Sequence, residues 1–148
     1  MLLLLVALMS AGAAPPTSVE LRDGSGAERP LPAPAVLLFW AAWCAPCRAE
    51  IRDLPAIRRA AAPLPVIVVA TEGTPRSRAL LQGIADDAIR YPADASVDVM
   101  PLLPGGGAAL PAAMARNADG AVCGMRRGRV TEADLAEWRV RCTAPVAR

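Results

Sequence analysis

Two long apolar runs and the periodic segments that follow them predict the order strand, helix, strand, helix in the first half of the chain. Val36–Trp40 and Val66–Ala70 are apolar at every position, which is typical of strands that are buried on both faces. Apolar residues at three- and four-residue spacing follow from about Cys44 to Ala61, and again after Thr74. This alternation predicts parallel strands that are joined by a right-handed crossover.

The two predicted helices differ in their boundaries. The first should bend at Pro55, because proline interrupts helical hydrogen bonding, and should end before Pro63. The second should begin with Thr74 as its N-cap and Pro75 as its first helical residue. The buried face of the first helix is expected to carry Ile51, Leu54, Arg58 and Ala61. The buried face of the second is expected to carry Leu80, Leu81, Ile84 and Ala88.

A proline- and glycine-rich stretch separates these elements from a predicted hairpin. Residues 91–110 contain several prolines and three consecutive glycines, and we expect a loop with at most one helical turn. The segments Pro111–Arg116 and Ala121–Arg126 flank turn-forming residues at 117–120. This arrangement predicts two antiparallel strands.

A closing helix is predicted after the hairpin. Thr131 and Asp134 have the spacing of a capping pair, in which each side chain can bond the backbone N–H of the other. The buried face of this helix is expected to carry Leu135 and Trp138 and to extend to Cys142. The chain contains no internal repeat.

The amino-terminal segment has the pattern of an export signal. Met1–Ala14 is apolar or small throughout, and it is shorter than the roughly 18 to 20 residues that cross a bilayer. Small residues at positions 11–13 favour cleavage after Ala13, although an uncleaved membrane anchor is the alternative, since the segment lacks Lys and Arg. A candidate strand, Ser18–Arg22, lies in a stretch that should run over the surface. The expected organisation is a signal peptide at 1–13, an extension at 14–34 and one domain at 35–148.

Composition narrows the function classes. The 148 residues are 54% hydrophobic and 20% charged, which is sufficient for a packed core. The chain contains no His, so catalysis by His and metal binding by His are excluded. A net charge of +2 indicates neither a nucleic-acid groove nor a basic membrane patch. Arg126, Arg127 and Arg129 are interpreted as a solvated turn, with a docking patch as the alternative.

Cys44 and Cys47 carry the strongest chemical signal. They stand two residues apart, where the first apolar strand changes into the first helix. A helix that starts at Cys44 places its sulfur beside unpaired backbone N–H groups and the positive end of the helix dipole, which favours the thiolate. Cys47 is one turn along and can close a disulfide with Cys44, while Pro46 costs no hydrogen bond at an early helical position. The spacing therefore predicts thiol-disulfide exchange.

The motif Trp43-Cys44-Ala45-Pro46-Cys47 and the predicted order of elements resemble the thioredoxin-like superfamily. They are most similar to the exported thiol-disulfide oxidoreductases typified by TlpA and ResA, over about residues 35–141. The resemblance implies an α/β protein with the thioredoxin fold. Such a fold has three layers, α/β/α, with a mixed central sheet and a C-terminal β-hairpin plus helix.

The resemblance also assigns roles to individual residues. Cys44 corresponds to the attacking, more exposed cysteine, and Cys47 to the buried resolving one. Pro111 corresponds to the family's cis-proline, which leaves the backbone of residue 110 free to pair with a substrate strand; an ordinary trans proline is the alternative. The expected substrate-binding residues are Trp43, Ala45, Pro46, Leu110 and Pro111.

Glu50 is the third expected catalytic residue. The resemblance places an acidic residue near the thiols at this position, where a partly buried carboxylate could exchange protons with them. The alternative is a solvent-exposed helix glutamate. Three features depart from the family pattern. Leu38 replaces the buried acidic or amide residue under the cysteines, Arg52 replaces a helix-kinking proline, and three consecutive glycines precede Pro111.

Cys123 and Cys142 form a second pair of cysteines. In an oxidising compartment a structural disulfide between them is expected, and a role in electron relay is the alternative. A four-cysteine zinc site is disfavoured, because the second pair lacks the spacing of a zinc knuckle. No metal and no cofactor are therefore predicted.

The sequence thus predicts an exported, monomeric thiol-disulfide oxidoreductase that reduces protein disulfides, in cytochrome c maturation or a comparable assembly task. Its expected partners are protein disulfide substrates and a membrane thiol-disulfide electron donor, in the periplasm or another exported location. Three alternatives are a net disulfide oxidant, a copper-handling module with the cysteine thiolates and methionines such as Met100 or Met114 as ligands, and a non-catalytic binding domain.

Overall fold

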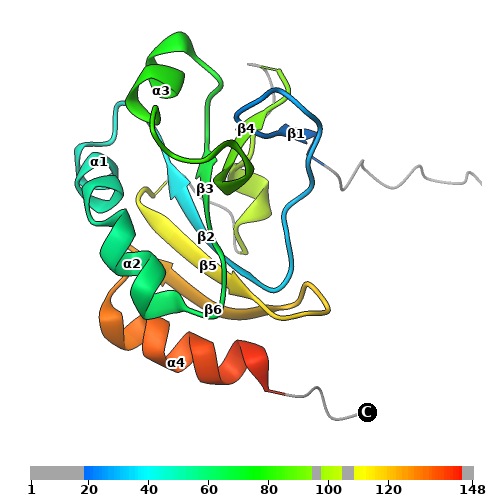
Figure 1. Ribbon diagram of the computed structural model, residues 1–148, viewed down its shortest axis with the longest axis vertical. Helices are drawn as coiled ribbons and strands as arrows, with labels where there is room; N and C mark the ends of the chain where they lie inside the picture. The colour runs from blue at the N-terminus through cyan, green and yellow to red at the C-terminus, as the bar shows by residue number, and fades with distance from the viewer. Residues whose placement is uncertain (1–18, 95–97, 105–108, 145–148) are drawn as a thin grey trace, which may run out of the picture.

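A computed structural model of the protein describes residues 19–94, 98–104 and 109–144 (Figure 1). The predicted signal peptide and the three consecutive glycines at 105–107 lie outside the described residues. A six-stranded sheet has the order β1-β4-β3-β2-β5-β6. Its strands are β1 (Leu21–Arg22), β2 (Ala35–Trp40), β3 (Val66–Ala70), β4 (Ile89–Pro92), β5 (Ala112–Arg116) and β6 (Val122–Arg127).

The sheet is mixed. β2 is parallel to β3, and β3 is parallel to β4. β5 is antiparallel to both β2 and β6, and β1 is antiparallel to β4. The predicted parallel crossover between the first two long strands and the predicted hairpin are therefore both present.

The described residues form four α-helices: α1 (Ala45–Arg52), α2 (Leu54–Ala61), α3 (Pro75–Leu80) and α4 (Glu132–Thr143). Figure 1 shows α1, α2 and α4 along the same side of the sheet. Two short 3-10 helices, η1 (Asp86–Ala88) and η2 (Met100–Leu102), complete the described elements.

The core has two parts because side chains of β2 alternate between the sheet's faces. Val36, Leu38 and Trp40 join the larger cluster, which also contains Trp138 of α4. Leu37 and its neighbours on the other face join a smaller cluster, against which Leu31 and two residues of η2, Met100 and Leu102, pack. The layer on this second face is therefore thin. The predicted α/β class, the mixed sheet and the C-terminal hairpin plus helix are confirmed.

The first predicted helix is two helices. α1 ends at Arg52, and α2 begins at Leu54, with Pro55 in its first turn. The predicted bend is thus a complete break at Asp53. Ile57 is buried in α2 at 7% exposure, whereas Arg58, which we expected on the buried face, is half-buried.

The second predicted helix is wrong in its length. Thr74 caps α3 as predicted, with its side chain accepting the Ser77 N–H, but the helix ends at Leu80. Gly83 has a φ of 88°, a left-handed conformation that ends helical structure at low cost. Leu81 is consequently buried, whereas Leu80 is 42% exposed.

One strand, β4, escaped the prediction, and it overlaps the stretch expected to be loop. β1 lies within the candidate strand Ser18–Arg22, and it makes that part of the expected surface extension an edge of the sheet. Arg90 is the reason that the apolar pattern did not indicate β4, since this residue is charged but only 6% exposed. Its guanidinium donates to the carbonyl oxygens of Pro30, Asp87 and Ile89, at 3.1, 2.8 and 2.7 Å, so burial of the charge is compensated.

The closing helix matches the prediction. Thr131 and Asp134 form a capping box at the start of α4, and Leu135, Trp138 and Cys142 are buried. Trp138 packs closely against Gly124 of β6, where an added Cβ would lie 2.3 Å from the indole Nε1. Within residues 19–94, 98–104 and 109–144, no helix has sufficient length and apolar character for a membrane span.

Candidate active site

Cys44 and Cys47 form a disulfide at the amino end of α1. Cys44 is the N-cap of this helix, and Cys47 lies in its first turn, with 5.2 Å between the two Cα atoms. The backbone N–H of Cys44 donates to Ala41 O at 3.1 Å, which turns the chain from β2 into the helix. The cysteine pair therefore lies just beyond the carboxyl end of strand β2.

The surroundings of the Cys44 sulfur favour negative charge on it. The Cys47 N–H lies 3.2 Å from the Cys44 sulfur, in place of the side-chain oxygen that usually caps a helix. Once the disulfide is opened, this donor and the helix dipole would stabilise a thiolate at Cys44 more than a thiol. The site thus has the electrostatic requirement for an attacking cysteine.

Accessibility distinguishes the two cysteines only slightly. Cys44 is 4% exposed and Cys47 is 0% exposed, in the order that the resemblance implied. Trp43 is 65% exposed, and Ala45 and Pro46 are also exposed. These three residues surround the disulfide with an accessible surface that is largely apolar.

Pro111 follows a cis peptide bond, as the resemblance implied. Its carbonyl oxygen accepts the Gly128 N–H at 2.8 Å, which fixes it to the hairpin. Ala112 pairs with Phe39, so Pro111 lies opposite the end of β2 that leads to Cys44. Leu110 is half-buried against the same core cluster as the cysteines, and its backbone makes no hydrogen bond with the described part of the chain.

Glu50 is buried, so its interpretation as an exposed glutamate is wrong. It is 1% exposed, on α1 one turn after Cys47. Its Oε1 accepts the backbone N–H of Val130 at 2.8 Å. Burial raises the pKa of the Glu50 carboxyl above its ordinary value of 4.5, and the Val130 hydrogen bond offsets part of this effect.

A Glu50→Gln protein should be more stable than wild type at neutral pH, by a few degrees in Tm. As pH rises, unfolded Glu50 releases its proton near its ordinary pKa of 4.5, whereas folded Glu50 retains it to a higher pH. Wild type therefore loses stability across this interval, while the amide does not titrate and can still accept the Val130 N–H. Thermal unfolding from pH 4 to pH 8 measures the difference. A Tm difference that does not change with pH would contradict this account.

Leu38 occupies its expected position beneath the site. It lies in β2 at 0% exposure, among apolar neighbours of the larger cluster. A leucine can neither accept nor donate a proton, so Glu50 is the buried carboxyl group closest to Cys47 along the chain.

Glu72 is a positioning residue that the sequence did not indicate. Its Oε1 accepts the backbone N–H of Ala42 at 3.1 Å and the Ser77 hydroxyl at 3.2 Å. Ala42 lies two residues before Cys44, whereas Ser77 is in α3 and fully buried. Glu72 thus connects α3 to the loop that carries the cysteine. No sequence motif signals such a contact, because it joins residues 30 positions apart.

Replacing Glu72 with Ala should lower the free energy of unfolding by about 1–2 kcal/mol, since it leaves the buried Ala42 N–H without its acceptor. Glu72→Gln keeps an acceptor oxygen and should recover most of this loss. Glu28→Ala, at an exposed residue, is the matched control and should change little. Chemical denaturation measures all three variants, and equal stability of Glu72→Ala and wild type would remove the assigned role.

Cys123 and Cys142 form a second disulfide, with 5.5 Å between their Cα atoms. It connects β6 to the end of α4, and Cys142 is buried while Cys123 is half-buried. All four cysteines are therefore paired as cystines, and a four-cysteine zinc site is ruled out in this state. No cluster of potential ligands for a metal ion occurs among the residues that the structure describes.

No protein-family model and no curated protein matches the chain, but solved structures do. The structure of dsbF from MTB, in mixed oxidized and reduced forms, aligns with a TM-score of 0.64 at 22% identity, covering 84% of this chain and 94% of that one. A thio-disulfide isomerase from Thermus thermophilus aligns with a TM-score of 0.64 at 22% identity, covering 86% of this chain and 93% of that one. A secreted Mycobacterium tuberculosis disulfide oxidoreductase homologous to E. coli DsbE aligns with a TM-score of 0.57 at 21% identity. The alignment covers 82% of this chain and 93% of that one.

These alignments extend over nearly the whole of each solved structure, so they concern the complete domain. At such identities they establish the architecture of this chain. The chain has the thioredoxin fold, with its Cys44–Cys47 disulfide at the amino end of α1.

Proposed function

We propose that the protein is an exported thiol-disulfide oxidoreductase that reduces protein disulfides. The observation that carries this proposal is the Cys44–Cys47 disulfide, whose Cys44 sulfur lies at the amino end of α1 and 3.2 Å from the Cys47 N–H. The solved structures similar in fold include one described as a secreted disulfide oxidoreductase, which supports both the chemistry and the exported location.

The proposed reaction begins with both cysteines reduced. The Cys44 thiolate attacks one sulfur of a substrate disulfide, which forms a mixed disulfide and releases one substrate thiolate. The Cys47 thiolate then attacks the Cys44 sulfur, which restores the Cys44–Cys47 bond and releases the second substrate thiolate. The substrate thus gains two electrons and, after protonation, two protons. A membrane thiol-disulfide electron donor would then return the pair to its reduced form.

Substrate binding is assigned to the surface around the disulfide. The exposed Trp43, Ala45 and Pro46 would contact the substrate, and the unpaired backbone of Leu110, held by Pro111, would pair with an extended substrate segment. Glu50 is proposed as the group that takes a proton from Cys47, or returns one, as the thiols ionise.

Two features support reduction as the direction. The residues between the cysteines are Ala45 and Pro46, neither of which adds a positive charge that would stabilise a thiolate. Glu50, when ionised, would oppose thiolate formation at Cys47 through like charge. A less stable thiolate makes the reduced form a better electron donor. Cytochrome c maturation, or a comparable assembly task, would require such a reductant.

The proposed organisation follows from the export signal. Residues 1–13 are assigned to a signal peptide or an uncleaved anchor, 14–34 to an extension and 35–148 to the domain. The paired β1 strand implies that the extension also contributes to the sheet. The mature protein is proposed to act as a monomer in the periplasm or a similar exported location.

The proposal is tested by trapping substrates. A Cys47→Ser protein, expressed with its native leader, should accumulate mixed disulfides through Cys44, because the resolving thiol is missing. Non-reducing gels and mass spectrometry detect the adducts, and a Cys44→Ser/Cys47→Ser protein is the matched control. If the Cys47→Ser protein forms no more adducts than this control, the exchange function is rejected.

A net oxidant is the second candidate, and Arg48 favours it. Its guanidinium, one turn after Cys44 on α1, forms no ion pair with the described carboxylates and would stabilise a Cys44 thiolate. The reduction potential of the pair decides between the two directions. A potential near that of thioredoxin, about −270 mV, supports the reductant, whereas one near about −120 mV assigns the oxidant.

A further inference from the structure

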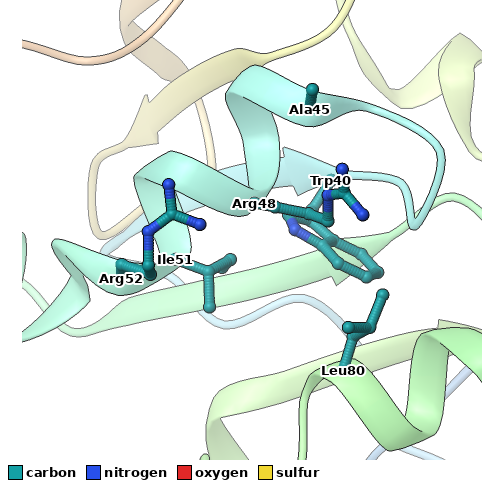
Figure 2. Close-up of a pocket in the computed structure, with 6 residues that line it drawn as sticks. All are labelled: Trp40, Ala45, Arg48, Ile51, Arg52 and Leu80. Atoms are coloured by element: carbon teal, nitrogen blue, oxygen red, sulfur yellow. The ribbon is translucent and has the colours of Figure 1, made fainter.

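A pocket of about 450 Å³ is lined in part by Ala45, which stands between the two cysteines of the Cys44–Cys47 disulfide. Its lining residues are Trp40, Ala45, Arg48, Ile51, Arg52 and Leu80 (Figure 2). Ala45 immediately follows Cys44 in the chain, so the pocket begins one residue from the proposed nucleophile. This volume falls in the range of small-molecule and side-chain binding sites.

The floor and one wall of the pocket are apolar. Trp40, at the end of β2, is 2% exposed and presents its ring to the cavity, and Ile51 lies beside it on α1. Leu80, at the end of α3, faces them from the other side and is 42% exposed (Figure 2). An exposed leucine at the edge of an apolar pocket gains favourable burial when a partner's apolar side chain covers it.

The rim carries two positive charges that no described carboxylate neutralises. Arg48 and Arg52 stand four residues apart on α1 and therefore lie on the same side of the helix. All 14 acidic side chains of the sequence lie in the described ranges, and none forms an ion pair with either arginine. Like charges at this spacing destabilise a helix slightly, and an anion between them would remove that cost.

We propose that this pocket is a specificity site for an apolar side chain followed by a carboxylate, in a substrate segment next to the reacting cysteine. The inference deepens the proposed function and depends on it. The apolar side chain would cover Trp40, Ile51 and Leu80, while the Asp or Glu carboxylate would bind the guanidinium groups of Arg48 and Arg52. The site therefore selects acidic, apolar flanking sequences among disulfide-bearing proteins.

The test compares peptides that differ at one position. Each peptide contains a single Cys that is preceded by Leu-Glu, Leu-Gln or Leu-Lys. The Cys is linked through a disulfide to 2-mercaptoethanol, which is uncharged. Reduced protein is mixed with each peptide, and the second-order rate constant is followed by separation of the products. Wild type should react roughly five- to tenfold faster with the Glu peptide than with the Lys peptide at low salt. The ratio should approach one in 0.5 M NaCl.

Variants connect this preference to the pocket. In the Arg48→Gln/Arg52→Gln protein the Glu-to-Lys ratio should fall below about two. Arg59→Gln, at an exposed arginine of α2 outside the pocket, is the matched control and should keep the wild-type ratio. Leu80→Ser should lower the rate for Leu-containing peptides relative to peptides with Ser in place of Leu. A preference that the double variant retains, or that Arg59→Gln also loses, overturns the inference.

The neutral disulfide of 2-mercaptoethanol distinguishes a failure of the exchange function from a failure of the pocket assignment. If reduced wild type does not react with it or with any peptide, the exchange function itself fails. If it reacts with the neutral disulfide but shows no preference among the peptides, the function stands and the pocket assignment fails. The salt series uses wild type alone, so it tests the charge preference even if a variant does not fold.

Discussion

A Cys44→Ser protein is expected to lose thiol-disulfide exchange by at least about a thousandfold, because a serine hydroxyl does not ionise near neutral pH and cannot attack a disulfide. The loss should be larger than for any other single substitution at the site, since Cys44 supplies the sulfur that forms the mixed disulfide. Insulin reduction, followed as turbidity, measures the catalytic rate. The structure should persist, because serine at the N-cap of α1 accepts the same Cys47 N–H.

The companion Cys47→Ser protein gives the contrast that tests the assigned roles. It should still perform the first attack, at a rate within about tenfold of wild type, but should turn over poorly because nothing resolves the mixed disulfide. A stoichiometric reaction with a neutral disulfide, read by mass spectrometry, separates the two steps. If Cys47→Ser abolished the first attack and Cys44→Ser retained it, the roles of the two cysteines would be reversed.

The sequence predicted those parts of the fold that have strong local signals. β2 and β3 are uninterrupted apolar runs, and the Thr131–Asp134 capping box is encoded within four consecutive residues. The Cys44 N-cap also followed from local pattern, since a strand-like run changes to a helical one at that point. Each of these features depends on residues that are neighbours along the chain.

The sequence failed where distant contacts decide the structure. β4 contains Arg90, whose charge argues against burial until its carbonyl partners, one of them 60 residues away, are known. A second error has a local cause, since α3 ends at Leu80 although apolar positions continue to Ile84, because the turn at Gly83 interrupts the helix. Apolar periodicity alone registers neither a distant partner nor a turn that breaks the helix.

The candidate site was predicted unevenly for the same reason. The cysteine motif and the cis-proline were available from sequence and resemblance. Glu50 could be exposed or buried until the Val130 N–H was placed beside it, 80 residues away. The pocket combines α1, the end of β2 and Leu80 of α3, and no motif joins these three segments.

Removing the second disulfide should have the largest effect on stability. In a Cys123→Ala/Cys142→Ala protein we expect the free energy of unfolding to fall by about 3 kcal/mol, because the cross-link closes a loop of about 20 residues in the unfolded chain. For a chain of this size the fall corresponds to roughly 10 °C in Tm. Denaturation under non-reducing conditions measures it, and Val122→Ala, at a 46% exposed neighbour, is the control that should change Tm little.

The activity of the same protein separates a structural cross-link from an electron relay. Cys123 and Cys142 connect β6 to the far end of α4, whereas Cys44 and Cys47 lie at the start of α1, next to the substrate-facing residues. A structural disulfide predicts that insulin reduction with dithiothreitol as donor is retained at temperatures well below the lowered Tm. It also predicts retention with the physiological donor, since no electron passes through the second pair. A variant that kept its Tm but could no longer be re-reduced by the membrane donor would instead identify Cys123 and Cys142 as the relay.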